Sequence, residues 1–169
     1  DFSYLPAVEK EESISISQFT LKEVVRQTIF SISDNDNNKL MTGELFDIKG
    51  NELKVVSLDG HRISIRKIEL KDSYEPKKVV VPGKTLNEIS KILSEASEEA
   101  EDLKIILNDK RAIFMIGNIK VVLRLLDGEF IKYRDVLPKE SKIKVRVNKG
   151  DLMESIERAS LLSKEGKNN

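Results

Sequence analysis

A long internal repeat is the feature that most constrains the fold of this chain. In each copy, an apolar residue of an alternating segment stands seven positions before the leucine that opens an amphipathic segment. The pairs are Ile14 and Leu21, Val79 and Leu86, and Val145 and Leu152. The leucines therefore recur with a nearly constant period, which is longer than that of the common solenoid repeats. This spacing predicts a domain of two similar halves followed by the start of a third copy.

The first copy has the pattern of one strand, one helix and three strands. Residues 13–16 alternate with period two, and Thr20 and Glu23 have the spacing of a capping box at the start of a helix. Three strands are expected at 40–48, 52–58 and 62–70, separated by turns at 49–51 and 59–61.

The second copy repeats that order. A β-branched run at 78–81 precedes a second capping-box spelling at 85–88. The apolar residues expected on one face of this helix are Leu86, Ile89, Ile92 and Leu93, and three further strands are expected at 102–107, 112–116 and 119–126. The third copy has only the alternation around 145–147 and the box at 151–154.

We therefore predict an α+β fold of two pseudo-symmetric halves, each a strand, a helix and three strands, with helices on one face of antiparallel sheets. Residues 1–12 are expected to be a linker from a preceding domain, and residues 13–137 a complete domain. Residues 138–169 are expected to be a linker with the first strand and helix of a truncated further domain, and to be less ordered because a lone amphipathic helix is marginal.

Composition excludes several classes of protein. The 29 Lys and Arg residues balance 29 Asp and Glu, so binding to nucleic acid through bulk positive charge is not expected. The chain has no cysteine, which removes disulfide frameworks and thiol nucleophiles. No apolar run approaches the roughly 20 residues of a membrane span, and no signal peptide opens the sequence, so a soluble protein is expected.

The parts of a catalytic site are missing from the sequence. His61 is the only histidine, and no cysteine or Gly-flanked serine elbow accompanies it. The alternating Asp34, Asp36 and Asn38 lack the glycine and glutamate of a calcium loop. We predict that the chain is not an enzyme and has no catalytic residue, metal site or cofactor.

The turn at 59–62 has two interpretations that the pattern leaves open. In one it is an ordinary hairpin, where Gly60 supplies a positive φ, Asp59 bonds back to the loop backbone, and His61 and Arg62 are solvated. In the other it is a recognition edge that presents His61 and Arg62 beside apolar neighbours.

Basic residues recur on the two expected helices, away from their apolar stripes. They are Lys22, Arg26, Lys84 and Lys91. A solvated helix face explains such residues in most proteins. They would track phosphates only if the fold lined the helices along one surface, and Glu23 and Glu88 would keep that lining weak.

Three segments resemble the bacterial replicative sliding clamp, the beta subunit of the DNA polymerase III holoenzyme. They are residues 56–65, 79–86 and 127–139. The Asp-Gly-His-Arg turn of the first segment, followed in the last by Asp-Gly-x-Phe-x-x-Tyr-x-x-Val-Leu-Pro, makes the resemblance specific, and it extends over nearly the whole chain.

The resemblance implies a non-catalytic role in DNA replication. Members have three similar domains, and two copies close head to tail into a cytoplasmic ring around duplex DNA, with helices inside and sheets outside. They give processivity to the replicative polymerase and tether polymerase, clamp loader and repair proteins through short peptide motifs. This chain would supply the middle domain and, alone, is expected to be monomeric. The four helix cations would then face DNA.

The resemblance also implies a peptide-binding pocket. Its residues here would be Met41, Leu58, Gly60, His61, Arg62, Ile63, Ile131, Asp135 and Val136. Where well-known members carry threonine, proline and arginine, this chain has Leu58, Ile131 and Asp135; the first two keep the pocket apolar and the third reverses a charge at its rim. The alternative to a clamp is a stand-alone protein-interaction module with no DNA role.

Overall fold

The computed structural model describes residues 12–34, 37–94, 102–138 and 140–165 of the chain. They form two units, one ending at Ile131 and one beginning at Lys132. The first unit contains, in order, β1 (Ser13–Ile16), α1 (Gln18–Thr28), the short helices η1 (Ile29–Ser31) and η2 (Lys39–Thr42), β2 (Gly43–Leu58), β3 (Ile63–Pro82), α2 (Gly83–Ile92), β4 (Leu103–Leu107), β5 (Arg111–Ile116) and β6 (Ile119–Arg124). The second contains η3 (Tyr133–Asp135) and α3 (Lys149–Glu165).

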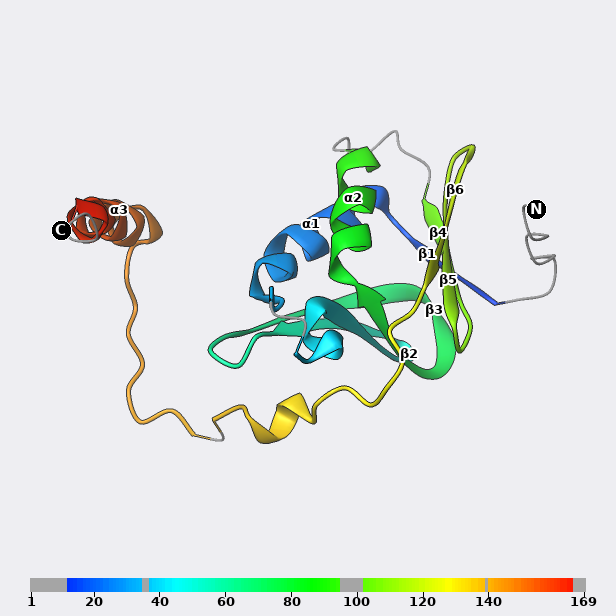
Figure 1. Ribbon diagram of the computed structural model, residues 1–169, viewed down its shortest axis with the longest axis horizontal. Coiled ribbons are helices and arrows are strands. Elements are labelled where there is room, and N and C mark those ends of the chain that lie inside the picture. Colours follow the sequence, from blue (N-terminus) through cyan, green and yellow to red (C-terminus); the bar gives the residue numbers. More distant parts are fainter. Residues whose placement is uncertain (1–11, 35–36, 95–101, 139, 166–169) are drawn as a thin grey trace. The chain divides into compact units, whose positions relative to one another are not determined.

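The first unit is an α+β structure with antiparallel strands (Figure 1). One sheet has the strand order β1-β4-β5-β6, so the first strand pairs with a strand of the second repeat. The other is the long two-stranded ribbon of β2 and β3. The three strands predicted in the second repeat are confirmed as β4, β5 and β6.

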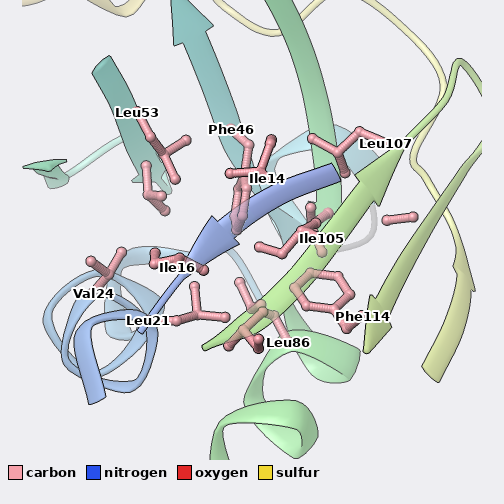
Figure 2. Packing of buried hydrophobic residues seen from close by; sticks show 14 of the residues in the cluster. Ile14, Ile16, Leu21, Val24, Phe46, Leu53, Leu86, Ile105, Leu107 and Phe114 are labelled. Carbon is pink, nitrogen blue, oxygen red and sulfur yellow. The ribbon is translucent and has the colours of Figure 1, made fainter. Parts of the chain in front are cut away.

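The core lies between the two sheets and the two helices (Figure 2). Helix α1 contributes Leu21 and Val24, and α2 contributes Leu86; all three are at most 1% exposed. They meet Phe46 of β2 and Phe114 of β5. Because each buried side chain of this size contributes about 1.5 to 3 kcal/mol, this shared core fixes both helices on the strands.

Helices α1 and α2 lie side by side in the first unit (Figure 1). Lys22 on α1 donates a hydrogen bond from Nζ to the Leu93 carbonyl at the end of α2, 3.2 Å away. Gln18 of α1 accepts a hydrogen bond from the Ser94 amide, 3.1 Å away. Of the four apolar residues expected on one face of α2, Ile92 is the exception, because it is 47% exposed in the last turn.

Each of the α-helices α1, α2 and α3 begins before the capping box expected from the sequence. Helix α1 is capped by Ser17, whose Oγ accepts from the Thr20 amide, 3.3 Å away. Pro82 precedes α2 without a side-chain cap, and Asn148 accepts from the Gly150 amide, 2.8 Å away, at the start of α3. The capping-box prediction is therefore wrong at each site, because residues upstream of the box already have helical geometry.

The predicted turn at 49–51 is also wrong. Strand β2 continues through it, and the pairing with β3 shifts register on both sides of Gly50, which has a φ of 62°. Such irregularities are β-bulges, which bend a ribbon without reversing it. The run at 78–81, predicted as a separate strand, is the end of β3.

The second unit differs from prediction in one element. Helix α3 forms where the third repeat predicts a helix, but residues 143–148 form no strand in the structure. A strand needs a neighbour to pair its backbone N–H and C=O groups, and no described strand pairs with this segment. No helix in the described part of the chain is long and apolar enough to cross a membrane.

One buried carboxyl stands out in the first unit. Glu44 of β2 is fully buried, and neither carboxyl oxygen has a hydrogen-bond partner among the described residues. Burial raises the pKa of Glu44 to about 8, a shift that the neighbouring Thr28 hydroxyl opposes only in part. The Thr28 hydroxyl already donates to the Val24 carbonyl, 2.8 Å away. Glu44 is therefore protonated at neutral pH.

Candidate partner-binding hairpin and helix face

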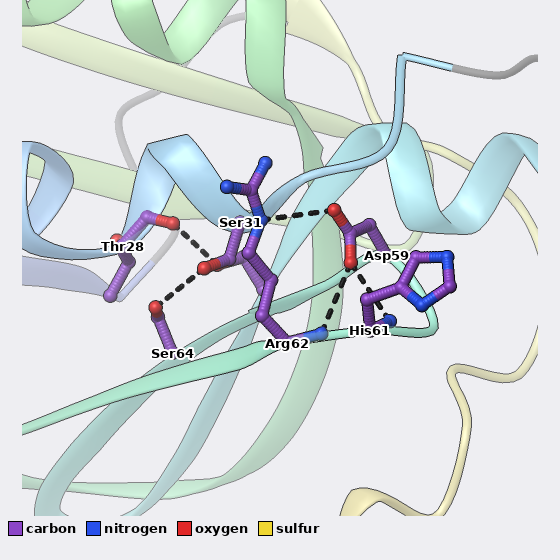
Figure 3. A network of polar contacts seen from close by, with 7 residues as sticks. Thr28, Ser31, Asp59, His61, Arg62 and Ser64 are labelled. Atoms are coloured by element: carbon purple, nitrogen blue, oxygen red, sulfur yellow. Dashed lines mark hydrogen bonds and ion pairs between the residues drawn. The ribbon is translucent and has the colours of Figure 1, made fainter. Parts of the chain in front are cut away.

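The loop between β2 and β3 is organised by Asp59 (Figure 3). Its Oδ1 accepts from the backbone amides of His61 at 3.0 Å and Arg62 at 3.2 Å. Chiefly through the His61 amide, these bonds lower the pKa of the Asp59 carboxyl. Gly60 has a φ of 92°, a backbone conformation that residues with a side chain rarely adopt. The positive φ of Gly60 and the bonds between Asp59 and the loop backbone, which the hairpin interpretation predicts, are therefore confirmed.

Arg62 is held on two sides. Its Nε donates to Oδ2 of Asp59, 3.0 Å away. Its guanidinium carbon lies 5.9 Å from the centre of the Phe30 ring, within the range of a cation–π contact. The Arg62 side chain is still 55% exposed, so the hairpin presents an oriented arginine at the surface.

Phe30 is the residue of this site that sequence reasoning missed. It lies in η1, directly after α1, and is 56% exposed. A signal was present: the apolar stripe of the helix places 21, 24, 25 and 28 on the buried face, and position 30 falls outside it.

Two hydroxyl contacts join the end of α1 and the following η1 to the hairpin strands (Figure 3). Ser57 of β2 donates from Oγ to the Thr28 carbonyl, 2.5 Å away. The Oγ atoms of Ser31 and Ser64 of β3 are 2.6 Å apart. These anchors fix the residues on both sides of Phe30 relative to Arg62.

Apolar members of the predicted pocket lie on several segments. Leu58 is buried and pairs directly across the ribbon with the half-buried Ile63. Met41 is half-buried in η2, and its carbonyl accepts from the Ser33 amide, 2.8 Å away. Ile131 is 37% exposed at the end of the first unit.

The hairpin therefore brings Leu58, Gly60, His61, Arg62 and Ile63 together, with His61 exposed at its tip. The remaining predicted residues, Asp135 and Val136, are exposed residues of the second unit.

The predicted DNA-facing cations lie on the adjacent helices α1 and α2, and three of them make contacts within the chain. Lys22 is half-buried and bonded to Leu93. Arg26 forms two bonds to the Glu23 carboxylate at 2.8 and 2.7 Å, and this contact lowers the pKa of Glu23.

Lys91 makes the equivalent pair on α2, where its Nζ is 2.6 Å from Glu88. Lys84 is exposed in the first turn of that helix. Each helix therefore carries a glutamate three positions before a basic residue, and the face has little excess positive charge.

A surface cavity of about 260 Å³ lies elsewhere in the first unit, lined by residues that include Ile14, Tyr74 and Leu107. None of the predicted peptide-binding residues lines it. In the described residues, no cluster of three or more histidine, cysteine or acidic side chains could hold a metal ion.

Paired helices over antiparallel strands, with an arginine hairpin at the end of a long ribbon, define an α+β domain of the DNA-clamp type. The family described as DNA polymerase III beta subunit, central domain, matches residues 15–132. The chain belongs to this family, whose members are non-catalytic processivity factors in DNA replication.

Relatives agree in sequence and structure. A beta sliding clamp from Staphylococcus epidermidis is 37% identical over 168 residues, which are 99% of this chain and 44% of the relative. A crystal structure from Eubacterium rectale assigned to the DNA polymerase III beta subunit is 59% identical, with a TM-score of 0.89 over 95% of this chain and 44% of the other. The Bacillus subtilis sliding clamp gives 34% identity and a TM-score of 0.91, covering this whole chain and 44% of that one. The chain thus spans less than half the length of these relatives.

Proposed function

We propose that this chain is the central part of a sliding clamp that encircles duplex DNA and keeps the replicative polymerase on its template. The family match over residues 15–132 carries the proposal. The whole protein would be a cytoplasmic head-to-tail homodimer, and the isolated chain a monomer.

We place the complete clamp domain at residues 13–137, built as two pseudo-symmetric halves. Each half would begin with a short strand segment leading into a helix, β1 into α1 and the end of β3 into α2. Residues 1–12 would link it to a preceding domain, and 138–169 would begin a following one. A family match that ends at residue 132 supports this division.

The face of α1 and α2 would lie toward DNA. Its cations would contact phosphates without reading bases, which suits a protein that slides. The intrahelical pairs Glu23–Arg26 and Glu88–Lys91 compete with phosphate for both cations. The ring, rather than phosphate affinity, would then keep the protein on DNA.

The hairpin would take a short peptide from polymerase, clamp loader or repair proteins. Leu58, Ile63, Met41 and Ile131 would supply its apolar walls, and His61 and Arg62 its polar edge. Two buried leucine-sized anchors contribute roughly 1.5 to 3 kcal/mol each, so binding is expected in the micromolar range at best.

Primer extension tests the proposal. The protein at its full encoded length, with its polymerase and clamp loader on a singly primed circular template, should lengthen the products made in one binding event. The Ile63→Asp variant should lose this effect. Unchanged product length with the wild-type protein would favour an interaction module with no DNA role.

A further inference from the structure

Phe30 is a large apolar side chain held at the surface by its neighbours. On one side of it, Ile29 packs against the core; on the other, Ser31 is fully buried and bonded to Ser64. The backbone around Phe30 is therefore fixed, and the Phe30 side chain is 56% exposed, the largest fraction among the exposed large apolar side chains in the described residues of the first unit. An exposed aromatic ring leaves apolar surface in contact with water, which is unfavourable relative to burial.

The ring of Phe30 faces a charge rather than the core. The Arg62 guanidinium carbon lies 5.9 Å from the ring centre, and Oδ2 of Asp59 accepts a hydrogen bond from Arg62 Nε. A flexible arginine normally loses conformational freedom when it binds a ligand. Here a carboxylate and an aromatic ring have already restricted it.

The remaining donors of Arg62 point to a ligand with acceptor oxygens. Within the described part of the chain, its terminal amino groups have no hydrogen-bond acceptor. Guanidinium donors form their strongest contacts with carboxylate and carbonyl oxygens in the plane of the group.

We propose that Phe30 is a positioning residue of the peptide site, which together with Asp59 orients the Arg62 guanidinium toward an acceptor oxygen of the bound peptide. This inference rests on the proposed peptide-binding function. Phe30 acts through Arg62, so its removal leaves the apolar walls intact and weakens only the contact that Arg62 makes.

The expected loss is modest because the contact is partly exposed. Replacing Phe30 by Ala should weaken peptide binding about three- to tenfold, the range of one exposed cation–π contact plus lost preorganisation. Phe30→Tyr keeps an aromatic face and should bind like the wild type. Phe30→Leu keeps apolar bulk without the ring and should bind like Phe30→Ala.

A double-mutant cycle with Arg62→Ala separates positioning from general packing. Binding of a fluorescent pentapeptide ending in Leu-Phe is measured by anisotropy on the protein at its full encoded length. The peptide is used in two forms, with a free C-terminal carboxylate and with a C-terminal carboxamide. Comparing them distinguishes a terminal carboxylate from a backbone carbonyl as the acceptor. Phe19→Ala is the matched control, because Phe19 is another exposed phenylalanine, on α1, and the cation–π contact of Arg62 is with Phe30.

If Phe30 positions Arg62, Phe30→Ala should not lower the affinity of the Arg62→Ala variant any further, with either peptide. If the wild-type protein binds the peptide and the effects of Phe30→Ala and Arg62→Ala on affinity are fully additive, the role of Phe30 is overturned. The same holds if the wild-type protein binds the peptide and Phe30→Ala has wild-type affinity. In both cases the peptide site itself still stands. No peptide binding by the wild type and Phe19→Ala proteins overturns both the site and the inference. Thermal unfolding of each variant shows that the fold is retained.

Discussion

Lys22 of α1 donates its Nζ hydrogen bond to the carbonyl of Leu93, 3.2 Å away at the C-terminal end of α2. The last carbonyls of a helix lack intrahelical partners, and a cation is favourable there because of the helix dipole. One lysine of the predicted DNA face therefore also joins the two helices.

Replacing Lys22 by Met should lower the free energy of unfolding by about 1 kcal/mol, through loss of a charged hydrogen bond in a half-buried position. Urea denaturation measures this. The control is Lys84→Met, which changes an exposed residue and should stay within about 0.5 kcal/mol of wild type. Equal stability of the two variants would contradict the tie between the helices.

Removing the two acidic partners on the helix face should strengthen DNA binding. The double variant Glu23→Gln and Glu88→Gln releases Arg26 and Lys91 from their ion pairs. Binding to a short labelled duplex at low salt should tighten severalfold, with a steeper salt dependence because more counterions are released. Fluorescence anisotropy at several salt concentrations measures both.

The control for this pair has the same net charge change on the β2–β3 ribbon. Glu52→Gln with Glu69→Gln removes two carboxylates from paired strands instead of helices. If it tightens DNA binding as much as the helix variant, overall charge and not the helix face governs affinity.

Glu44 should make the stability of the domain fall as pH rises. Its pKa is about 8 in the folded chain and near 4.5 when unfolded, so folding takes up a proton between these values. The contribution is fully present below pH 4.5 and is lost as pH rises through 8, by a few kcal/mol in total. Glu44→Gln should flatten this dependence and be the more stable protein at pH 8.

The Glu52 carboxyl has a lowered pKa, so its effect on the pH dependence of stability is opposite to that of Glu44. Its ion pairs, chiefly with Lys54 and then Lys67, lower its pKa to about 2. Its contribution is present above pH 4.5 and falls only toward pH 2, so Glu52→Gln should leave the slope between pH 5 and 8 unchanged. A wild-type protein with flat stability across that range would contradict the buried neutral state of Glu44.

The apolar wall of the hairpin is tested by Ile63→Asp. Ile63 is half-buried opposite Leu58, so the new carboxylate remains hydrated while it disrupts the apolar surface. Peptide affinity should fall at least tenfold, with the fold retained in circular dichroism. Ile119→Asp, at an exposed position on β6, should bind normally. An unfolded Ile63→Asp protein would assign this residue to the core instead.

Much of the first unit could be predicted from the sequence because its signals are local. Helix α1 and the strands of the second repeat are predicted from the apolar pattern of residues that are close in the sequence. The turn at 59–62 is predicted from an aspartate followed by a glycine. The family resemblance, which the match over residues 15–132 bears out, rested on this turn together with the segments at 79–86 and 127–139.

The errors arose where distant residues decide the outcome. Gly50 has a turn-like spelling, but pairing with Tyr74 keeps β2 extended through it. The alternation at 145–147 has no paired strand among the described residues. The helical period indicates that Phe30 lies off the buried face, but its contact with Arg62, which is distant in the sequence, appears only in the fold. Glu44 has no sequence signal of burial, since a carboxylate in an alternating strand usually faces solvent.

Retention on DNA of different topology tests the clamp proposal most directly. The protein at its full encoded length is loaded by its clamp loader onto nicked circular DNA, isolated by gel filtration at moderate salt, and followed after the circle is cut once. A closed ring predicts stable retention on the circle and rapid loss from the linear product. Equal release from circular and linear DNA, or retention on both, would contradict encirclement.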